Sequence, residues 1–394
     1  MGVENNIPEG WVKSTIGELT YFIGEKISPT ELTVYNYIST ENLLSDKKGV
    51  VVSSNLPNVS KVNEFRIGDI LFSNIRTYFK KVWQANINGG ASNDVLIFRP
   101  LDESQLNKSY LYRIISSDLF IDFTVKTAKG TKMPRGDKNA MKLFRVALPP
   151  LPEQKAIAKV LTAFDDKIEL LQAQNNTLET MAQTIFKEWF GKYQIGDELP
   201  EGWKVGDIYN VLEVQYGYPF KSKLFNENKE GLPLIRIRDI RKGVTGFYTT
   251  EDYEEEYIIR PGDVLAGMDA VFEPYLWSGG KGLLNQRACR FIPKDFVSRI
   301  FVFEFMKPHL SFYEKTKVGT TVIHLGKGDL DFIETVIPDK ESLLKFKTLS
   351  TPIEEKIINN QQEIQSLTKT RDTLLPKLMS GQVRVKNLKQ TSDA

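Results

Sequence analysis

We predict an α+β fold in which two similar mixed α/β domains are joined by two long antiparallel helices that form a coiled coil. The sequence of 394 residues repeats itself once, which predicts a pseudo-two-fold relation between its halves. Each half opens with short β-type runs separated by Gly, Asn and Pro. Each half closes with a long segment whose apolar residues recur at alternating steps of four and three, as in a coiled coil.

The repeat is read from short matching stretches. IPEGW, which starts at Ile7, returns as LPEGW from Leu199, and IGDILFSN from Ile67 returns as PGDVLAGM from Pro261. The spacing between copies then becomes constant, for Gly130-Thr131 with Gly319-Thr320, Pro149 with Pro338, and DDKI at 165–168 with EEKI at 354–357. A constant spacing excludes insertions there, whereas the changing spacing before it predicts loops of different length on similar scaffolds.

The domain boundaries follow from this order. We place the first β-rich domain at 1–150 and the second at 193–340, because both contain runs such as DVLIFRP and RACRFIP. The helices occupy 151–192 and 341–384, and 385–394 is a tail. Thr351-Pro352 followed by Glu354 is typical of a helix start, so we expect the second helix to restart or kink there and Pro376 to disturb its last turns.

Each long helix carries a seam, which is the row of residues that recur at alternating steps of four and three. The two seams match, so we expect the helices to pair with each other. Placing Asn175 in the same layer as Asn360 maps the other seam residues onto one another. We predict that these two side chains form a hydrogen bond that sets the register. The alternative is that both are solvated and a seven-residue slip fits equally well. The seams are Ile157, Leu161, Phe164, Ile168, Leu171, Asn175, Leu178, Ala182, Ile185 and Trp189, and Ile353, Ile357, Asn360, Ile364, Leu367, Arg371, Leu374 and Leu378.

Composition excludes several classes of protein. One cysteine and two histidines are too few for a zinc site, and no apolar run could span a bilayer, so we expect a cytoplasmic protein without membrane contact. Net charge is only +2, so any nucleic-acid binding must come from local patches. We find no methyltransferase or phosphate-binding loop. Asp339 with Glu354 and Lys356 has a nuclease-like spacing, but the last two open a helix, so we expect no catalysis.

The chain resembles the specificity subunit of type I restriction-modification systems over nearly its whole length. The resemblance is carried by PEGW before each β-rich domain, PPLPEQKAIAKVLTAFDDKIE and TLETMAQTIFKEWF in the first helix, LIRIRDIRKG and GLLNQRACRF in the second domain, and RDTLLPKLMSGQV at the end of the second helix. The two copies differ at the start of the helices, where the second has KESL at 340–343 and the first has PEQ at 152–154. The first domain also has NYISTENL where the second has IRIRDI.

This resemblance implies two target recognition domains, each reading one half of a bipartite sequence in double-stranded DNA, and two spacer helices that fix the gap. Two methyltransferase subunits, and restriction subunits in the full complex, would be the protein partners. S-adenosylmethionine, ATP and Mg²⁺ would be bound by those partners and no cofactor by this chain. A continuous helix from Glu153 to Phe190 would be about 57 Å long at roughly 1.5 Å per residue. Successive major grooves on one face of DNA lie about 34 Å apart, so we interpret the helix pair as a ruler.

Two other functions stay open at this point. One is a coiled-coil adaptor that binds proteins without reading DNA. The other is a specificity domain detached from a fused restriction enzyme. Steep weakening of duplex DNA binding by salt would separate the first alternative from a DNA reader.

Candidate DNA contacts lie in basic segments of both domains. NIRTYFKKVW and the loop at 126–138 are interpreted as phosphate anchors, although both could be solvated faces. Arg236 and Arg238 would lie on one face of a strand and could read guanine, or could pair with Asp239 or Asp269. Asn285, Gln286 and Arg287 are interpreted as structural. The candidates are Arg76, Tyr78, Lys80, Lys81, Lys129, Lys132, Arg135, Arg236, Arg238, Arg241, Lys315, Lys317 and Lys327.

Both helices also carry apolar residues that a two-helix pair cannot bury. We predict that these residues contact the methyltransferase subunits. The alternative is that they pack against the chain's own domains. They are Val160, Leu170, Met181, Phe186, Ile358, Leu375 and Met379.

Overall fold

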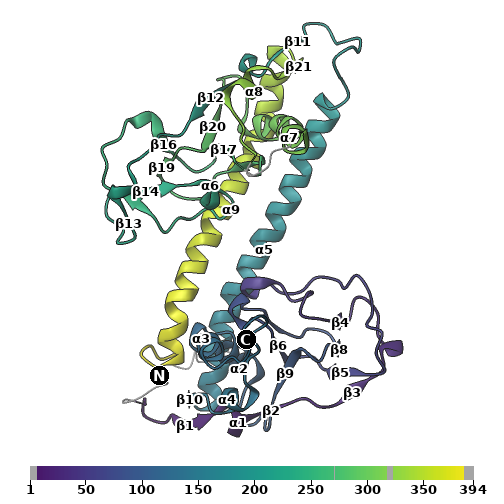
Figure 1. Cartoon of the computed structure of the whole chain (residues 1–394), viewed down its shortest axis with the longest axis vertical. Helices are drawn as coiled ribbons and strands as arrows, with labels where there is room; N and C mark the ends of the chain where they lie inside the picture. The colour runs from purple at the N-terminus through teal and green to yellow at the C-terminus, as the bar shows by residue number, and fades with distance from the viewer. Residues whose placement is uncertain (1–6, 270, 317–322, 386–394) are drawn as a thin grey trace, which may run out of the picture. The chain divides into compact units, whose positions relative to one another are not determined.

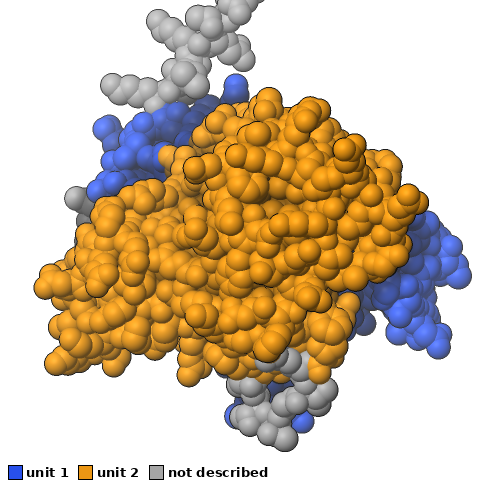
Figure 2. Space-filling view, turned by 90° about the horizontal axis from the view of Figure 1, so that it is seen from above, with its two compact units in different colours: residues 1–166, 368–394 blue, residues 167–367 orange. Residues whose placement is uncertain are grey.

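The computed structural model describes residues 7–269, 271–316 and 323–385 (Figure 1). The chain divides into two compact units, coloured blue and orange in Figure 2. Unit 1 comprises residues 1–166 and 368–394, and unit 2 comprises residues 167–367. Each unit therefore combines one β-rich half of the sequence with part of both long helices.

Unit 1 contains two four-stranded sheets and one pair of strands. The first sheet, in the order β2-β9-β6-β7, is antiparallel, whereas the second, β3-β5-β8-β4, pairs β4 with β8 in parallel. Strands β1 and β10 form the pair. Strand β10 directly precedes the first long helix in the sequence. The bounds are β1 Val12–Thr15, β2 Thr20–Phe22, β3 Lys26–Ile27, β4 Tyr37–Ile38, β5 Val62–Phe65, β6 Ile70–Ser73, β7 Val82–Gln84, β8 Gly89–Ala91, β9 Val95–Pro100 and β10 Arg145–Leu148.

Short helices cover the first sheet of unit 1. Helix α2 (Lys108–Ile115) packs on β6 and β9, and its N-cap Asn107 accepts a hydrogen bond from the backbone N–H of Tyr110. Ser117 caps α3 (Asp118–Lys126) in the same way. Burial of the whole of β6 and edge-to-face packing of Phe72, Phe98 and Phe120 hold this layer together. The remaining helices are α1 (Ile16–Leu19) and α4 (Lys138–Lys142).

Unit 2 repeats this architecture in the part of it that the structure describes. The sheet β12-β20-β17-β18 corresponds to β2-β9-β6-β7, and the pair β11-β21 corresponds to β1-β10. The copies diverge in the other sheet, which in unit 2 has the order β13-β15-β14-β19-β16. The bounds are β11 Lys204–Asp207, β12 Leu212–Tyr216, β13 Phe225–Asn226, β14 Leu232–Ile235, β15 Tyr248–Thr249, β16 Ile258–Ile259, β17 Val264–Gly267, β18 Pro274–Leu276, β19 Gly282–Leu284, β20 Ala288–Pro293, β21 Glu334–Ile337, α6 Ile237–Ile240, α7 Arg299–Thr316 and α8 Lys327–Asp331.

The two long helices are α5 (Leu151–Phe190) and α9 (Lys340–Met379). Their contacts are antiparallel: in unit 2 Lys167 pairs with Glu363 at 3.4 Å, and further along α5 Asn175 meets Asn360. Helix α9 does not restart at Pro352, contrary to our expectation, and it also continues past Pro376. Ile353 and Ile357 pack in the core of unit 2, and this burial offsets the backbone hydrogen bond that proline removes.

These observations confirm the predicted fold class of two similar α/β domains with a paired set of long helices. Within the described ranges, no helix combines the length and the apolar character needed to cross a bilayer.

Candidate nucleic-acid interface

The loop after β6 in unit 1 presents aromatic and basic side chains in an unusual backbone conformation. It contains the 3₁₀ turn Thr77–Phe79, which is flanked by Arg76 and Lys80 in the left-handed region, with φ of 49° and 54°. Tyr78 and Phe79 are exposed. Left-handed backbone at non-glycine residues costs about 1 to 2 kcal/mol each. Such strain is found most often where a loop is shaped for function.

This loop contacts the second basic segment of unit 1, which follows α3. The backbone N–H of Arg76 donates to the carbonyl of Pro134 at 2.8 Å, and Ile75 forms a β-bridge with Arg135. The side chain of Arg76 donates to the carbonyl of Lys132 at 3.4 Å. Two segments that we identified separately in the sequence therefore form one surface.

Four of the predicted unit 1 cations lie on this surface, and two do not. Lys129 pairs with Asp137 at 2.6 Å and Lys132 is exposed beside Arg76 and Arg135. The four are Arg76, Lys129, Lys132 and Arg135. By contrast, Lys80 donates to Asp118 of α3 at 2.9 Å, which raises the pKa of the lysine, and Lys81 donates to the carbonyl of Thr40 at 2.6 Å.

Unit 2 builds the corresponding surface from the loop after β17. The N–H of Leu325 donates to the carbonyl of Met268 at 2.8 Å, and Asp269 forms a β-bridge with His324. Arg287 pairs with Asp269 at 2.9 Å. Lys327 is exposed at the start of α8 and Lys315 near the end of α7, whereas the predicted contact Lys317 lies outside the described residues.

The strand that we predicted through IRIRDI is wrong. Strand β14 ends at Ile235, and Asp239 accepts a hydrogen bond from the backbone N–H of Arg236 at 3.1 Å, which starts helix α6. The Arg236 side chain also pairs with Asp239, at 2.9 Å, and lies 3.7 Å over the ring of Phe247. The internal pairing that we held as the alternative for Arg236 is therefore present, while Arg238 and Arg241 are exposed.

Replacing Arg236 with alanine should lower the free energy of unfolding of unit 2 by about 2 kcal/mol, because buried Asp239 loses its charged partner and Phe247 loses its cation. Hydrogen exchange of unit 2 peptides in the full chain measures this change. The exposed Arg241→Ala is the control and should shift stability by less than about 0.5 kcal/mol. Unchanged protection in Arg236→Ala would contradict a structural role for the arginine.

The helix pair contains the hydrogen bond that we predicted. Nδ2 of Asn360 donates to Oδ1 of Asn175 at 2.9 Å, and Nδ2 of Asn175 lies 3.4 Å from the carbonyl of Ile357. Both asparagines are buried. Their role in setting the register stays a prediction.

The apolar residues predicted to contact partner subunits divide into two groups. Phe186 packs on the core of unit 2, and Leu375 and Met379 pack on that of unit 1. A Cβ on Gly262 would lie 2.6 Å from Cδ1 of Ile358, so this side chain also covers its own domain. The coverage of these four residues favours the alternative that they pack within the chain.

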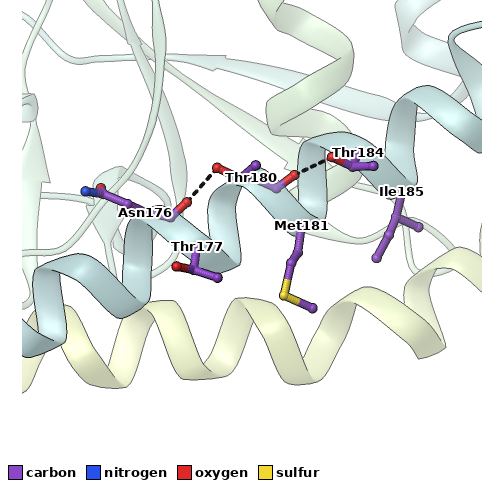
Figure 3. Close-up of a pocket in the computed structure, with 6 residues that line it drawn as sticks. All are labelled: Asn176, Thr177, Thr180, Met181, Thr184 and Ile185. Atoms are coloured by element: carbon purple, nitrogen blue, oxygen red, sulfur yellow. Dashed lines mark hydrogen bonds between the residues drawn. The ribbon is translucent and has the colours of Figure 1, made fainter.

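The second group remains accessible on α5. Leu170 and Met181 are about half exposed, and Val160 is half-buried. Met181 lies in a shallow groove with Thr177 and Ile185, and Figure 3 shows these three side chains projecting from one side of the helix. The nearby threonine hydroxyls donate to backbone carbonyls four residues earlier, so the groove presents mainly apolar atoms.

The nuclease-like carboxylates have structural contacts. Asp339 accepts hydrogen bonds from Nε1 of Trp203 and from the backbone N–H of Ser342, both at 2.9 Å. Glu354 pairs with Arg299 at 2.9 Å. The two carboxylates thus anchor the first part of α9 to the domain of unit 2.

The structure contains two copies of one scaffold, and each copy presents a pair of loops with basic residues. This combination is typical of a DNA specificity protein. Residues 8–180 and 200–369 both match the type I restriction modification DNA specificity domain, and the chain belongs to this family. Among its relatives is the type I restriction enzyme MjaVIII specificity subunit of Methanocaldococcus jannaschii, which is 28% identical over 97% of this chain and 95% of its own length.

One further relative and one solved structure are similar to this chain, and the structure shows the shared fold alone. The MjaIX specificity subunit of the same organism is 29% identical over 71% of this chain and 70% of its own length. The crystal structure of the type I restriction-modification system S subunit from M. genitalium shares the fold, with a TM-score of 0.60 over 96% of this chain and 98% of that one, at 18% identity.

Proposed function

We propose that this chain is the sequence-specific DNA-binding subunit of a type I restriction-modification complex. Each recognition domain reads one half of a bipartite target in double-stranded DNA. The observation that carries the proposal is the repeated surface, because in both units the loop after the central strand of the antiparallel sheet contacts the segment that precedes the last short helix. Equal scaffolds with unlike loops are suited to two unlike half-sites.

The chain itself is non-catalytic in this proposal. Methylation of adenine would be performed by two methyltransferase subunits, which hold S-adenosylmethionine, while ATP and Mg²⁺ would serve the restriction subunits. The helix pair sets the distance between the half-sites, and the accessible residues of α5, Leu170 and Met181, are candidate docking points for the methyltransferase subunits.

Methylome sequencing of a host that expresses this chain with its modification partner tests the proposal. We expect N6-methyladenine in a two-part motif with a fixed gap, and its loss when the chain is deleted. An active, expressed partner that methylates the same sites without the chain would favour the adaptor alternative.

Filter binding to duplex DNA gives a second readout of the interface. The affinity should fall roughly a thousandfold between 50 and 200 mM salt if about six phosphates are contacted. Lys132→Ala should weaken binding to all sequences equally. It should also reduce the slope of log affinity against log salt concentration by about 1, because one phosphate contact is lost. Binding that does not depend on salt would contradict a phosphate-contacting surface.

A further inference from the structure

Each unit holds the same three-part frame at one end of its antiparallel sheet. The residue after the central strand donates its backbone N–H to the residue before the next long strand, Asn74 to Asp94 in unit 1 and Met268 to Arg287 in unit 2, both at 2.8 Å. The third part is the segment of Arg135 in unit 1 and of His324 in unit 2, which bridges to the first part. The two units therefore present side chains from matched backbone positions.

The side chains on this frame differ, yet each unit places one arginine against one carboxylate. In unit 1, Arg135 of the third segment pairs with Asp94 of the second at 2.9 Å. In unit 2, Arg287 of the second segment pairs with Asp269 of the first at 2.9 Å. Nδ1 of His324 lies 2.7 Å from the other oxygen of Asp269. The arginine thus comes from a different segment in each unit, yet in both units it is held by a carboxylate of the same frame.

Stability does not account for these ion pairs. The side chains of Arg135 and its partner Asp94 are 59% and 41% exposed, so their ion pair contributes little to folding. Arg287 is 68% exposed, although its partner Asp269 is only 13% exposed, so solvent also screens this pair. Arg287 also has φ of 71°, a left-handed conformation that a non-glycine residue rarely adopts. A strained backbone that displays a tethered, exposed guanidinium indicates selection for what that group contacts.

The chemistry of a tethered arginine suits base recognition. A guanidinium has five N–H donors. Arg135 approaches Asp94 through Nη2, and Arg287 approaches Asp269 through Nη1. The tether orders the long side chain before binding and so reduces the entropy lost on contact. The remaining donors match O6 and N7 of guanine in the major groove, which is the commonest base-specific contact of arginine.

We propose that Arg135 and Arg287 are specificity-determining residues, each of which reads a guanine in the half-site of its own unit. Asp94 and Asp269 are positioning residues that hold the two guanidinium groups. This inference rests on the proposed function, and it adds which side chain carries base readout in each half.

Methylome sequencing of variants in the full complex tests this assignment. Arg287→Ala should relax a single G·C position in one half of the methylated motif, with roughly tenfold or greater loss of discrimination there and no change in the other half. Arg135→Ala should do the same in the opposite half. Asp269→Asn should relax the same position as Arg287→Ala, by a smaller factor.

The chain provides matched controls at the other end of the same strands. Arg66 pairs with Glu25 at 3.3 Å and Arg260 with Glu255 at 2.8 Å, and their side chains are 58% and 57% exposed. Alanine at either position removes an equally exposed, carboxylate-paired arginine and should leave the motif unchanged. Arg135→Lys and Arg287→Lys keep the positive charge but lose the planar guanidinium that can bind guanine with two donors. They should therefore relax the requirement for guanine at the same positions, while overall methylation falls less than in the alanine variants.

Each other outcome overturns a defined part of the proposal. A uniform fall in methylation at all sequences would make the arginines phosphate contacts, and an unchanged motif would make them surface ion pairs. If the alanine variants do not accumulate, the lysine variants decide between these readings. A wild-type chain that directs no bipartite methylation would instead refute the proposed function, which separates the two failures.

Discussion

Replacing Phe346 with alanine lowers the free energy of unfolding of unit 2 by about 3 to 5 kcal/mol. Phe346 of α9 is fully buried. The centroid of its ring lies 5.1 Å from that of Phe190, 5.9 Å from that of Trp189 and 6.1 Å from that of Phe301 of α7. The substitution therefore removes one side chain that joins both long helices to the recognition domain. Neighbouring rings cannot collapse into the space without losing their own edge-to-face contacts.

Hydrogen exchange followed by mass spectrometry measures this effect in the full chain, and protection of unit 2 peptides should fall about 100-fold or more. Phe332→Ala is the control, because this ring is largely exposed in the same unit, and protection should change little. A loss below about 1 kcal/mol in Phe346→Ala would contradict the role of this ring as the junction.

Replacing Asp165 with alanine should destabilise unit 1 by about 3 kcal/mol, because it leaves the nearly buried Arg113 without its anion. Asp165 of α5 accepts from Arg113 of α2 and from Arg371 of α9 at 2.7 Å. The side chain of Arg113 is only 8% exposed, and Thr162 supplies its other hydrogen bond, at 2.8 Å. One carboxylate thus neutralises arginines from two helices.

The same exchange measurement on unit 1 peptides checks this prediction, with the exposed neighbour Asp166→Ala as control. The double variant Arg113→Met with Asp165→Leu should recover most of the lost stability, because an apolar pair can replace a buried ion pair. If the double variant is no more stable than Asp165→Ala, the cost does not come from the unpaired charge.

The sequence predicts the helix pair well, because heptad spacing constrains which residues face the partner helix. The contact between Asn175 and Asn360 agrees with the register that we predicted by placing these two asparagines in one layer, although the spacing alone also allowed a seven-residue slip. The domain class follows from the duplicated order of β-type runs and helices.

The details of the candidate interface could not be predicted in the same way. IRIRDI alternates like a strand, but a single hydrogen bond to Asp239 converts it into a helix start. Arg287 follows Asn285 and Gln286 in a strand-like run with no adjacent glycine to indicate a left-handed turn, so we interpreted it as structural. That the loops at 74–81 and 126–138 meet depends on strand pairing between distant segments, which local patterns do not specify.

The interleaved composition of the units has a consequence for synthesis on the ribosome. Unit 2 is one continuous segment, 167–367, and all of its residues are translated before the second part of unit 1, which starts at residue 368. The core of unit 1 that contains Ile157 and Leu161 also includes Leu378, with Leu374 packed against it, and Arg384 pairs with Glu153 at 2.6 Å. Although its first residues precede unit 2, unit 1 is completed only after residues 368–384, so a nascent chain exposes the apolar helix face of unit 1 until these residues have been translated.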